Sequence, residues 1–485
     1  MPDILQSPEE VAQVPLVVDL DGTLLSSDLL LETGMDYLRH QPLGFYKLLF
    51  WLLQGKINLK ENLACMTDID VSILPYNAQV IEFIQSARTA GRPVVLATAS
   101  HLILAEKISV HLKLFDEVLA TTQSCNLSAE YKRNLLVEKY GERRFDYIGN
   151  STDDLVVWSS ARRAYVVCPP DSHIEQKAKA QGNVEKIIYS SKPDIKTWMK
   201  ALRLHQWMKN VLIFIPLLAS HQFISPPLLW NVLLAFFFFG LCASSVYLLN
   251  DLLDLADDRH HHRKRYRPFA AGVLSIHSGL IFFPLLLIFS IGGAALLLPW
   301  KFSVVLIGYY ILTLAYSLSL KRKMIVDVIA LAMLYTIRMV AGATACGLAL
   351  TFWILAFSMF IFLSLALVKR YAELLTERDK GNIGKTRGRG YYTDDLEMIA
   401  SLGAASGYIS VMVLAFYIND SSTALLYSHP KIIWLACPLL LFWVSRIWML
   451  THRGEMHDDP VIFAIKDKIS LLVGFLFVFI FGIAI

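Results

Sequence analysis

The pattern of apolar and polar positions changes near residue 200. Before it, short apolar runs alternate with charged stretches, which is typical of a soluble α/β domain. After it, apolar runs approach the ~20 residues that a helix needs to cross a bilayer. We expect about nine spans, or eight if the short first one is not a span. They cover 210–218, 228–249, 276–298, 302–318, 326–348, 352–367, 399–418, 432–450 and 469–485.

This pattern predicts a multidomain chain. Residues 1–190 form an α/β domain with a parallel sheet, 191–200 a linker, and 201–485 an all-α polytopic membrane bundle. Lys and Arg gather in 259–267, 321–323, 369–389 and 453–468, whereas the connections on the other side hold only Lys301 and Lys431. The positive-inside rule places the basic loops and the N-terminal domain in the cytoplasm.

Composition narrows the classes of function. Of the 485 residues, 18% are charged and 55% hydrophobic, which excludes a protein that is soluble throughout. A net charge of +4 does not suggest a nucleic-acid partner. The six cysteines lie far apart without a C-x-x-C spacing, so neither a disulfide scaffold nor a zinc site is expected. The polar, acidic start of the chain does not resemble a signal peptide.

The soluble half carries carboxylates at a predicted strand end. The run VPLVVDLDGTLL places Asp19 and Asp21 directly after an apolar strand, where α/β folds hold their chemistry. Asp19 is suited to attack phosphorus and Asp21 to act as general acid and base, with Mg²⁺ shielding the phosphate. A second strand ends near Thr98, whose hydroxyl suits a phosphoryl oxygen.

Two further groups follow along the chain. Lys132 lies at a helix start and suits a developing negative charge. A third strand ends near Asn150 and Asp154, which together with Asp19 and Asp21 are candidate Mg²⁺ ligands. This order resembles the haloacid dehalogenase (HAD) superfamily of phosphatases, whose motifs read D-x-D-G-T, Ser/Thr, Lys and G-D-x-x-x-D. The resemblance implies a helical cap over about 28–77. The family's G-D pair reads Gly149-Asn150 here, which removes one charge from the metal site.

The membrane half has its own acidic group, at the end of the second span. In NDLLDLADD, a continuing helix would place Asn250, Asp254 and Asp258 on one face with Asp251 beside them. Carboxylates at this spacing repel one another unless a cation lies between them, and oxygen ligands suit Mg²⁺. We call Asp251, Asp254 and Asp258 the acidic box. It predicts a second magnesium site.

The box and the basic residues after it resemble the UbiA superfamily of intramembrane transferases, which implies a Mg²⁺–diphosphate site on the cytoplasmic side. The family's second motif, Y-x-x-x-K with D-x-x-x-D, is matched in part, because Leu331 stands where the second Asp belongs. Together with R-x-x-Q-W-x-K-N, R-x-x-A-G and K-R-Y-A-E-L, the pattern resembles the decaprenyl-phosphate phosphoribosyltransferase branch. Candidate substrate-binding residues are Lys209, Asn250, Lys264, Arg265, Arg267, Tyr316, Lys321, Asp327, Lys369, Arg370 and Tyr371.

The resemblance implies a bifunctional enzyme in a bacterial-type inner (plasma) membrane. Phosphoribosyl diphosphate (PRPP) would donate 5-phosphoribose to a polyprenyl phosphate, with Asp251, Asp254 and Asp258 as catalytic metal ligands. The N-terminal domain would then remove the 5-phosphate. Three alternatives stay open: a prenyltransferase that uses a prenyl diphosphate and an aromatic acceptor, a regulatory N-terminal domain, and a lipid carrier without chemistry.

Overall fold

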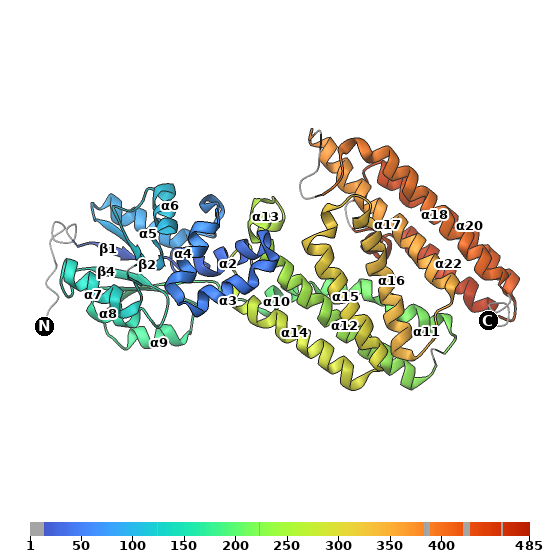
Figure 1. The fold of residues 1–485 in the computed structure, drawn as a ribbon, viewed down its shortest axis with the longest axis horizontal. Coiled ribbons are helices and arrows are strands. Elements are labelled where there is room, and N and C mark those ends of the chain that lie inside the picture. The colour runs from blue at the N-terminus through green and yellow to red at the C-terminus, as the bar shows by residue number, and fades with distance from the viewer. Residues whose placement is uncertain are drawn as a thin grey trace. The chain divides into compact units, whose positions relative to one another are not determined.

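The computed structural model describes residues 14–123, 125–222, 224–382, 384, 389–420, 427–456 and 459–485 (Figure 1). Two compact units divide the chain. Unit 1 comprises Met1–Leu202 and Tyr247–Phe283, and unit 2 comprises Arg203–Val246 and Pro284–Ile485. The segment with the acidic box thus belongs to the same unit as the α/β domain.

The centre of unit 1 is a six-stranded parallel sheet in the order β3-β2-β1-β4-β5-β6. β1 lies between β2 and β4, and the register pairs Val18 with Leu96 on one side and with Ile148 on the other. The strands are β1 (Leu16–Val18), β2 (Val94–His101), β3 (Glu117–Thr121), β4 (Asp146–Gly149), β5 (Ala164–Cys168) and β6 (Val184–Tyr189). This order brings the carboxyl ends of β2, β1 and β4 together at the point where the chain direction across the sheet reverses.

Helices cover both faces of the sheet, as the near-continuous burial of the strands requires. Leu16 and Val18 pack into one apolar core and Val17 into another, because successive side chains of a strand point to opposite faces. The helices are α5 (Ala78–Thr89), α6 (Leu102–Leu112), α7 (Ala129–Tyr140), α8 (Leu155–Ser160) and α9 (His173–Lys179). The predicted α/β fold class is confirmed.

A helical cap is inserted between β1 and α5. It consists of α2 (Leu29–His40), α3 (Phe45–Leu53) and α4 (Lys56–Met66), joined by a small core of Tyr37, Trp51 and Leu63. Asp28 caps α2 by accepting hydrogen bonds from the first-turn amides. Most of α3 remains uncovered, with Phe45 58%, Phe50 56% and Leu53 87% exposed.

The remaining helices of unit 1 lie after the α/β domain and around the connection between α12 and α14. They are α10 (Ile195–Ala201), the end of α12 (Pro226–Leu253), α13 (Leu255–His260) and the start of α14 (Ile276–Leu297). Trp198 of α10 packs on Phe282 of α14, with ring centroids 4.5 Å apart.

Unit 2 is helical. Among the described residues, seven helices are long and apolar enough to span a membrane, or eight if one bent pair forms a single span. Besides α12 and α14 they are α15 (Trp300–Leu318), α16 (Val326–Cys346) and α17 (Phe352–Asp379). The last two are α18 (Leu396–Asn419) and α20 (Ala436–His452), each together with the 3₁₀ turn before it, over Thr393–Asn419 and Pro430–His452. The bent pair is α21 (Pro460–Lys466) and α22 (Lys468–Ala484), with an angle of 84°.

The structure agrees with the lower expected count of eight spans if the bent pair forms one span, because the expected first span, 210–218, is not a long helix. That stretch lies in a 3₁₀ segment, η3 (Leu204–Phe214), followed by the five-residue helix α11 (Ile215–Ala219). Polar side chains of η3 bond to other elements: Asn210 accepts from Arg338, and Trp207 donates to Ser244. These bonds, and a length of five residues for α11, do not suit a membrane-spanning helix.

Glycines let the helices of unit 2 approach closely. A Cβ on Gly342 of α16 would lie 1.9 Å from the carbonyl oxygen of Ile213, and one on Gly403 of α18 would lie 2.0 Å from the Trp448 ring. Small residues at such contacts are typical of packed membrane helices.

Candidate active sites

The predicted nucleophile, Asp19, lies at the carboxyl end of β1. Its backbone N–H continues the sheet by donating to the carbonyl of Ile148 at 3.0 Å. The side chain is 10% exposed. Lys132 Nζ lies 2.6 Å from one carboxylate oxygen, and Thr23 donates to the other at 3.3 Å. The structure therefore pairs the predicted nucleophile with the predicted lysine.

Asp21, two residues later, is held between the cap and β2. Its Oδ1 accepts from the backbone N–H of Leu29 at 2.8 Å, and its Oδ2 accepts from Ser100 at 2.6 Å and Thr98 at 3.4 Å. Leu29 begins α2, so the positive end of that helix faces the carboxylate. The position suits a group that exchanges a proton at the sheet edge.

A chain of hydrogen bonds runs from Lys132 to the end of β4. Lys132 donates to Tyr147 at 3.0 Å, and Tyr147 donates to Asp154 at 2.8 Å. Asp154 also accepts from the backbone N–H of Asn150 at 3.0 Å, which fixes the loop after β4. Asn150 in turn accepts from Thr23 at 3.0 Å. The predicted metal ligands thus lie on neighbouring loops of the same edge.

Burial and charge shift the pKa values at this edge. Burial raises the pKa of Asp19 to about 7 against the opposing effect of Lys132, and Asp154 raises it further. Removal from water and the charge of Asp28 raise the pKa of Asp21 to about 6. With three carboxylates and one ammonium, the ionised group Asp19, Asp21, Asp154 and Lys132 carries −2, which suits a divalent cation.

Three contributors at this edge were missed by the sequence reasoning. Ser100 lies closer to Asp21 than Thr98 does, and Tyr147 joins Lys132 to Asp154. Lys60 of the cap helix α4 donates to the backbone carbonyl of Ala99 at 2.7 Å. Side-chain alternation along β2 places Thr98 and Ser100 on one face and would have found Ser100; a cap lysine carries no comparable signal.

The acidic box lies where α12 gives way to α13. The helix is interrupted at Asp254, but Asp254 N–H donates to Asn250 at 2.9 Å and Asp258 N–H to Asp254 at 2.8 Å, so the four-residue spacing persists. One nitrogen of Arg267 lies 3.2 Å from Asp251 and 2.6 Å from Asp258. Two carboxylates of the box can therefore share one cation, and with Arg267 the ionised box carries −2.

The basic residues next to the box differ in placement. Lys264 and Arg265 are exposed, and Arg265 donates to Tyr266 at 2.8 Å, whereas Arg267 is half-buried against the box. Of the predicted cations in this loop, the structure thus brings Arg267 to the carboxylates, while Lys264 and Arg265 face solvent.

In unit 2, Asp327 and Arg370 form a buried pair between α16 and α17. Both side chains are fully buried, with Arg370 Nη2 2.7 Å from Asp327 Oδ2. Tyr391 donates to Asp327, and Arg370 also pairs with Glu373. Arg389 donates to the predicted Tyr316 at 3.2 Å and lies 3.7 Å from Glu373. Arg370, Arg389, Asp327 and Glu373 balance their charges.

A second cluster in unit 2 has excess positive charge. Lys209 of η3 lies 2.8 Å and Lys369 of α17 3.3 Å from Asp459, and Tyr335 donates to the same carboxylate at 3.0 Å. Two ammonium groups on one carboxylate leave a net charge of +1, which suits a phosphate.

Other predicted residues of this unit form further contacts. Tyr371 is buried and bonds to His452 at 2.9 Å, so its hydroxyl is tied to α20. Lys321 is half-buried in η5 (Leu320–Arg322). Arg338 donates to Asn210 at 3.0 Å, which joins the R-x-x-A-G segment to the Q-W-x-K-N segment.

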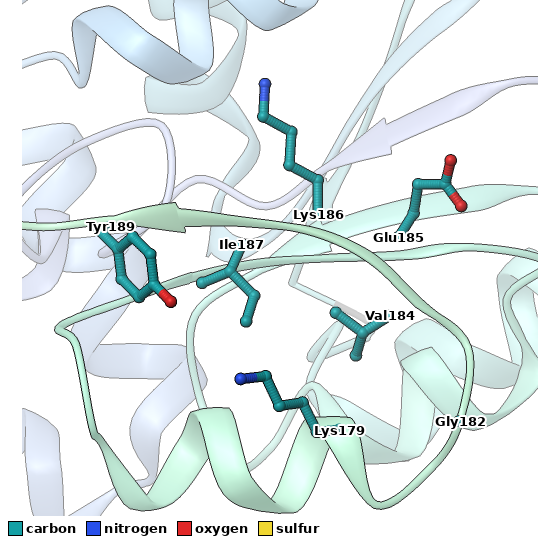
Figure 2. A pocket seen from close by; sticks show the side chains of 7 residues that line it. All are labelled: Lys179, Gly182, Val184, Glu185, Lys186, Ile187 and Tyr189. Carbon is teal, nitrogen blue, oxygen red and sulfur yellow. The ribbon is translucent and has the colours of Figure 1, made fainter.

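No ready-made group of three His, Cys, Asp or Glu side chains for a metal occurs in the described part of the chain. A bound Mg²⁺ would need further oxygens, from Asn, water or a phosphate. A separate hollow of about 560 Å³ lies along β6 and α9 and contains none of the predicted site residues (Figure 2). It is lined by Lys179, Gly182, Val184, Glu185, Lys186, Ile187 and Tyr189.

Comparisons with known proteins place the chain in a family. The model of the UbiA prenyltransferase family matches residues 211–472. The chain is 37% identical to an uncharacterized protein, y4nM, of Sinorhizobium fredii, over 95% of this chain and 89% of that protein. It is 30% identical to decaprenyl-phosphate phosphoribosyltransferase of Mycobacterium tuberculosis, over 59% of this chain and 93% of that enzyme. A UbiA homolog from Archaeoglobus fulgidus, solved with GPP and Mg²⁺, is 17% identical with a TM-score of 0.45 and covers 59% of this chain and 99% of its own. The chain is a multi-pass membrane protein and belongs to the UbiA prenyltransferase family.

Proposed function

We propose that this chain transfers 5-phosphoribose from PRPP to a polyprenyl phosphate and then removes the 5-phosphate with its N-terminal domain. The main support is the acidic box, in which one cationic nitrogen of Arg267 bridges Asp251 and Asp258. The phosphoribosyltransferase relative supports the choice of substrates.

In the transfer step, Asp251, Asp254 and Asp258 would hold Mg²⁺ on the donor diphosphate. Bound there, magnesium neutralises the negative charge that the leaving diphosphate develops. Arg267 moves from the carboxylates to the diphosphate oxygens, because a guanidinium binds phosphate with two parallel hydrogen bonds. Carbon 1 of the ribose gains positive character, and an oxygen of the lipid phosphate attacks it.

Basic side chains of unit 2 suit the other anionic groups of the two substrates. The cluster of Lys209, Lys369 and Asp459 has excess positive charge for a phosphate. The buried Asp327–Arg370 pair keeps a guanidinium in place at the start of the basic K-R-Y-A-E-L segment. An aromatic acceptor would need fewer cations, and Leu331 replaces the second carboxylate that the family's D-x-x-x-D motif places there, so we favour the phosphoribosyl donor.

In the second step, Asp19 attacks the 5-phosphate and Asp21 protonates the departing ribose oxygen. Water then hydrolyses the aspartyl phosphate, with Asp21 taking its proton. Lys132 neutralises the nucleophile and the phosphoryl oxygens, and Mg²⁺ would be held by Asp19, Asp21, Asn150 and Asp154. Both steps belong on the cytoplasmic face of a bacterial inner membrane, where the positive-inside rule puts the basic loops.

The test uses purified full-length protein with radiolabelled PRPP, Mg²⁺ and polyprenyl phosphates of several lengths. Asp254→Ala should abolish transfer, and activity retained at saturating Mg²⁺ would refute the role of the acidic box. Asp19→Asn should leave transfer intact and accumulate the phosphorylated lipid-linked ribose. Unchanged dephosphorylation in that variant would refute the second step. Lipid product formed from a prenyl diphosphate and an aromatic acceptor would favour the prenyltransferase alternative.

A further inference from the structure

Unit 1 contains a buried ion pair that joins the cap to the segment after the acidic box. Arg259 of α13 donates to Glu32 of α2 through both terminal nitrogens, at 3.0 and 2.6 Å. Its third nitrogen group, Nε, donates to the backbone carbonyl of Ala270 at 2.9 Å. The side chains are only 5% and 4% exposed. The guanidinium is thus bound on two edges and excluded from water.

Other contacts of the same kind surround this pair. Arg39 of α2 pairs with Asp257, and His260 lies 3.5 Å from Asp70 of the cap segment. A Cβ on Gly272 would lie 2.9 Å from Cβ of Ser26, so the two backbones approach closely there. A cavity of about 220 Å³ lies between α2 and α13. The contact is therefore a surface with charge complementarity rather than a single pair.

The two ends of the pair lead directly to the two candidate active sites. Glu32 lies in the first turn of α2, the helix whose Leu29 N–H holds Asp21. Arg259 follows Asp258 of the acidic box, which is bound by Arg267. Glu32 lies three positions after Leu29 in α2, and Arg259 is the next residue after Asp258 in α13.

We propose that Glu32 and Arg259 form a latch that fixes the N-terminal domain on residues 254–272 of the same chain. Its purpose rests on the proposed function: the latch keeps the phosphatase beside the lipid-linked product, so that the 5-phosphate is removed before the lipid leaves. Glu32 and Arg259 are positioning residues, because they contact no substrate. A buried ion pair suits this role, since loss of one partner leaves an uncompensated charge and strongly penalises a partly docked state.

The test cuts the folded chain between the domain and the membrane part. A protease site is inserted between Ser191 and Lys192, which are both exposed, and the detergent-solubilised protein is cut and captured by a C-terminal tag. The N-terminal fragment should stay bound in the parent protein. In Glu32→Lys the N-terminal fragment should be released, because its affinity for the captured part should fall by about a hundred-fold or more. Retention equal to the parent would overturn the latch.

Controls separate loss of the latch from loss of folding. Glu185→Lys breaks an exposed pair with Arg163 in the same domain and should leave retention unchanged. Combining Glu32→Arg with Arg259→Glu reverses the pair and should restore part of the retention. Protection of the buried Cys168 from a thiol reagent reports folding of the domain. If Glu32→Lys unfolds it, the isosteric Glu32→Gln is used, and full retention of that variant would overturn the proposal.

A second measurement tests the purpose of the latch in the uncut chain. Glu32→Gln should still transfer phosphoribose and hydrolyse a soluble phosphomonoester, but the phosphorylated lipid-linked ribose should rise at least about ten-fold relative to the final product. An unchanged ratio would overturn the hand-off role. If the parent protein performs neither reaction, the proposed function fails, whereas the retention result still decides whether the latch exists.

Discussion

Asp21→Asn should stabilise the N-terminal domain while abolishing the phosphatase activity that we propose for it. The structure raises the pKa of Asp21 to about 6, chiefly through its removal from water, from an ordinary value of 3.8. Since one pKa unit corresponds to ~1.4 kcal/mol, the ionised carboxylate destabilises the fold by up to about 3 kcal/mol above pH 6. Because Asp21 is partly exposed and an amide forms weaker hydrogen bonds, the expected gain in the free energy of unfolding is about 1–2 kcal/mol.

The amide can keep much of the present geometry. Its oxygen can accept from the Leu29 N–H, now 2.8 Å from Oδ1, and its nitrogen can donate to Ser100, now 2.6 Å from Oδ2. For a domain of this size, 1–2 kcal/mol corresponds to an increase of roughly 2–8 °C in the melting temperature. Activity should fall at least about a hundred-fold, because the amide supplies no proton to the leaving oxygen.

The assay follows thiol labelling of the buried Cys168 against temperature in a chelator, read on its peptide by mass spectrometry. The stability that Asp21→Asn gains over the parent should be present at pH 8 and shrink as the pH falls through 6 towards 4.5. At low pH the Asp21 carboxyl of the parent is protonated in the fold, so the cost of burying its charge disappears. If Asp21→Asn lowers the stability at pH 8, or raises it by the same amount at every pH, burial does not destabilise the ionised Asp21 carboxylate and the reasoning is refuted.

Three further predictions concern the same edge and the membrane helices. Magnesium should raise the temperature of Cys168 labelling more at pH 8 than at pH 5.5, because protonated carboxyls bind the ion weakly; an equal effect at both pH values would argue against binding at Asp19 and Asp21. Lys132→Met should abolish phosphomonoester hydrolysis but leave transfer from PRPP unchanged, and hydrolysis within ten-fold of the parent would contradict its role. Gly342→Ala should reduce the yield of folded protein in size-exclusion chromatography, since its Cβ would meet the Ile213 carbonyl, whereas Gly308→Ala on α15, with open space around it, should behave like the parent.

Local sequence signals predicted which residues meet at the sheet edge of unit 1, while their role in a phosphatase site stays a prediction. Asp19 and Asp21 follow an apolar strand, and the parallel sheet brings Thr98 and Asn150 to the same side. The choice among neighbouring hydroxyls was beyond the sequence, because Thr98 and Ser100 share a face and only the position of the cap decides which is nearer to Asp21.

The membrane half was predicted less completely, since its polar contacts join distant segments. Apolar length located the long helices but left open whether the stretch at 210–218 is a span, because hydropathy does not show that Asn210 bonds to Arg338. The meeting of Arg267 with Asp251 and Asp258 depends on how the loop folds back after α13. The role of these residues as a metal site stays a prediction.

The uncovered face of α3 has a practical consequence for work on the domain in isolation. Phe45, Phe50 and Leu53 are three of the nine residues of this helix and would all meet water in an excised fragment of residues 1–190. Such a fragment should self-associate in detergent-free buffer, since soluble monomers rarely expose contiguous apolar patches of this kind. Replacing those three side chains with glutamine or lysine is the natural first step toward crystals of the α/β domain.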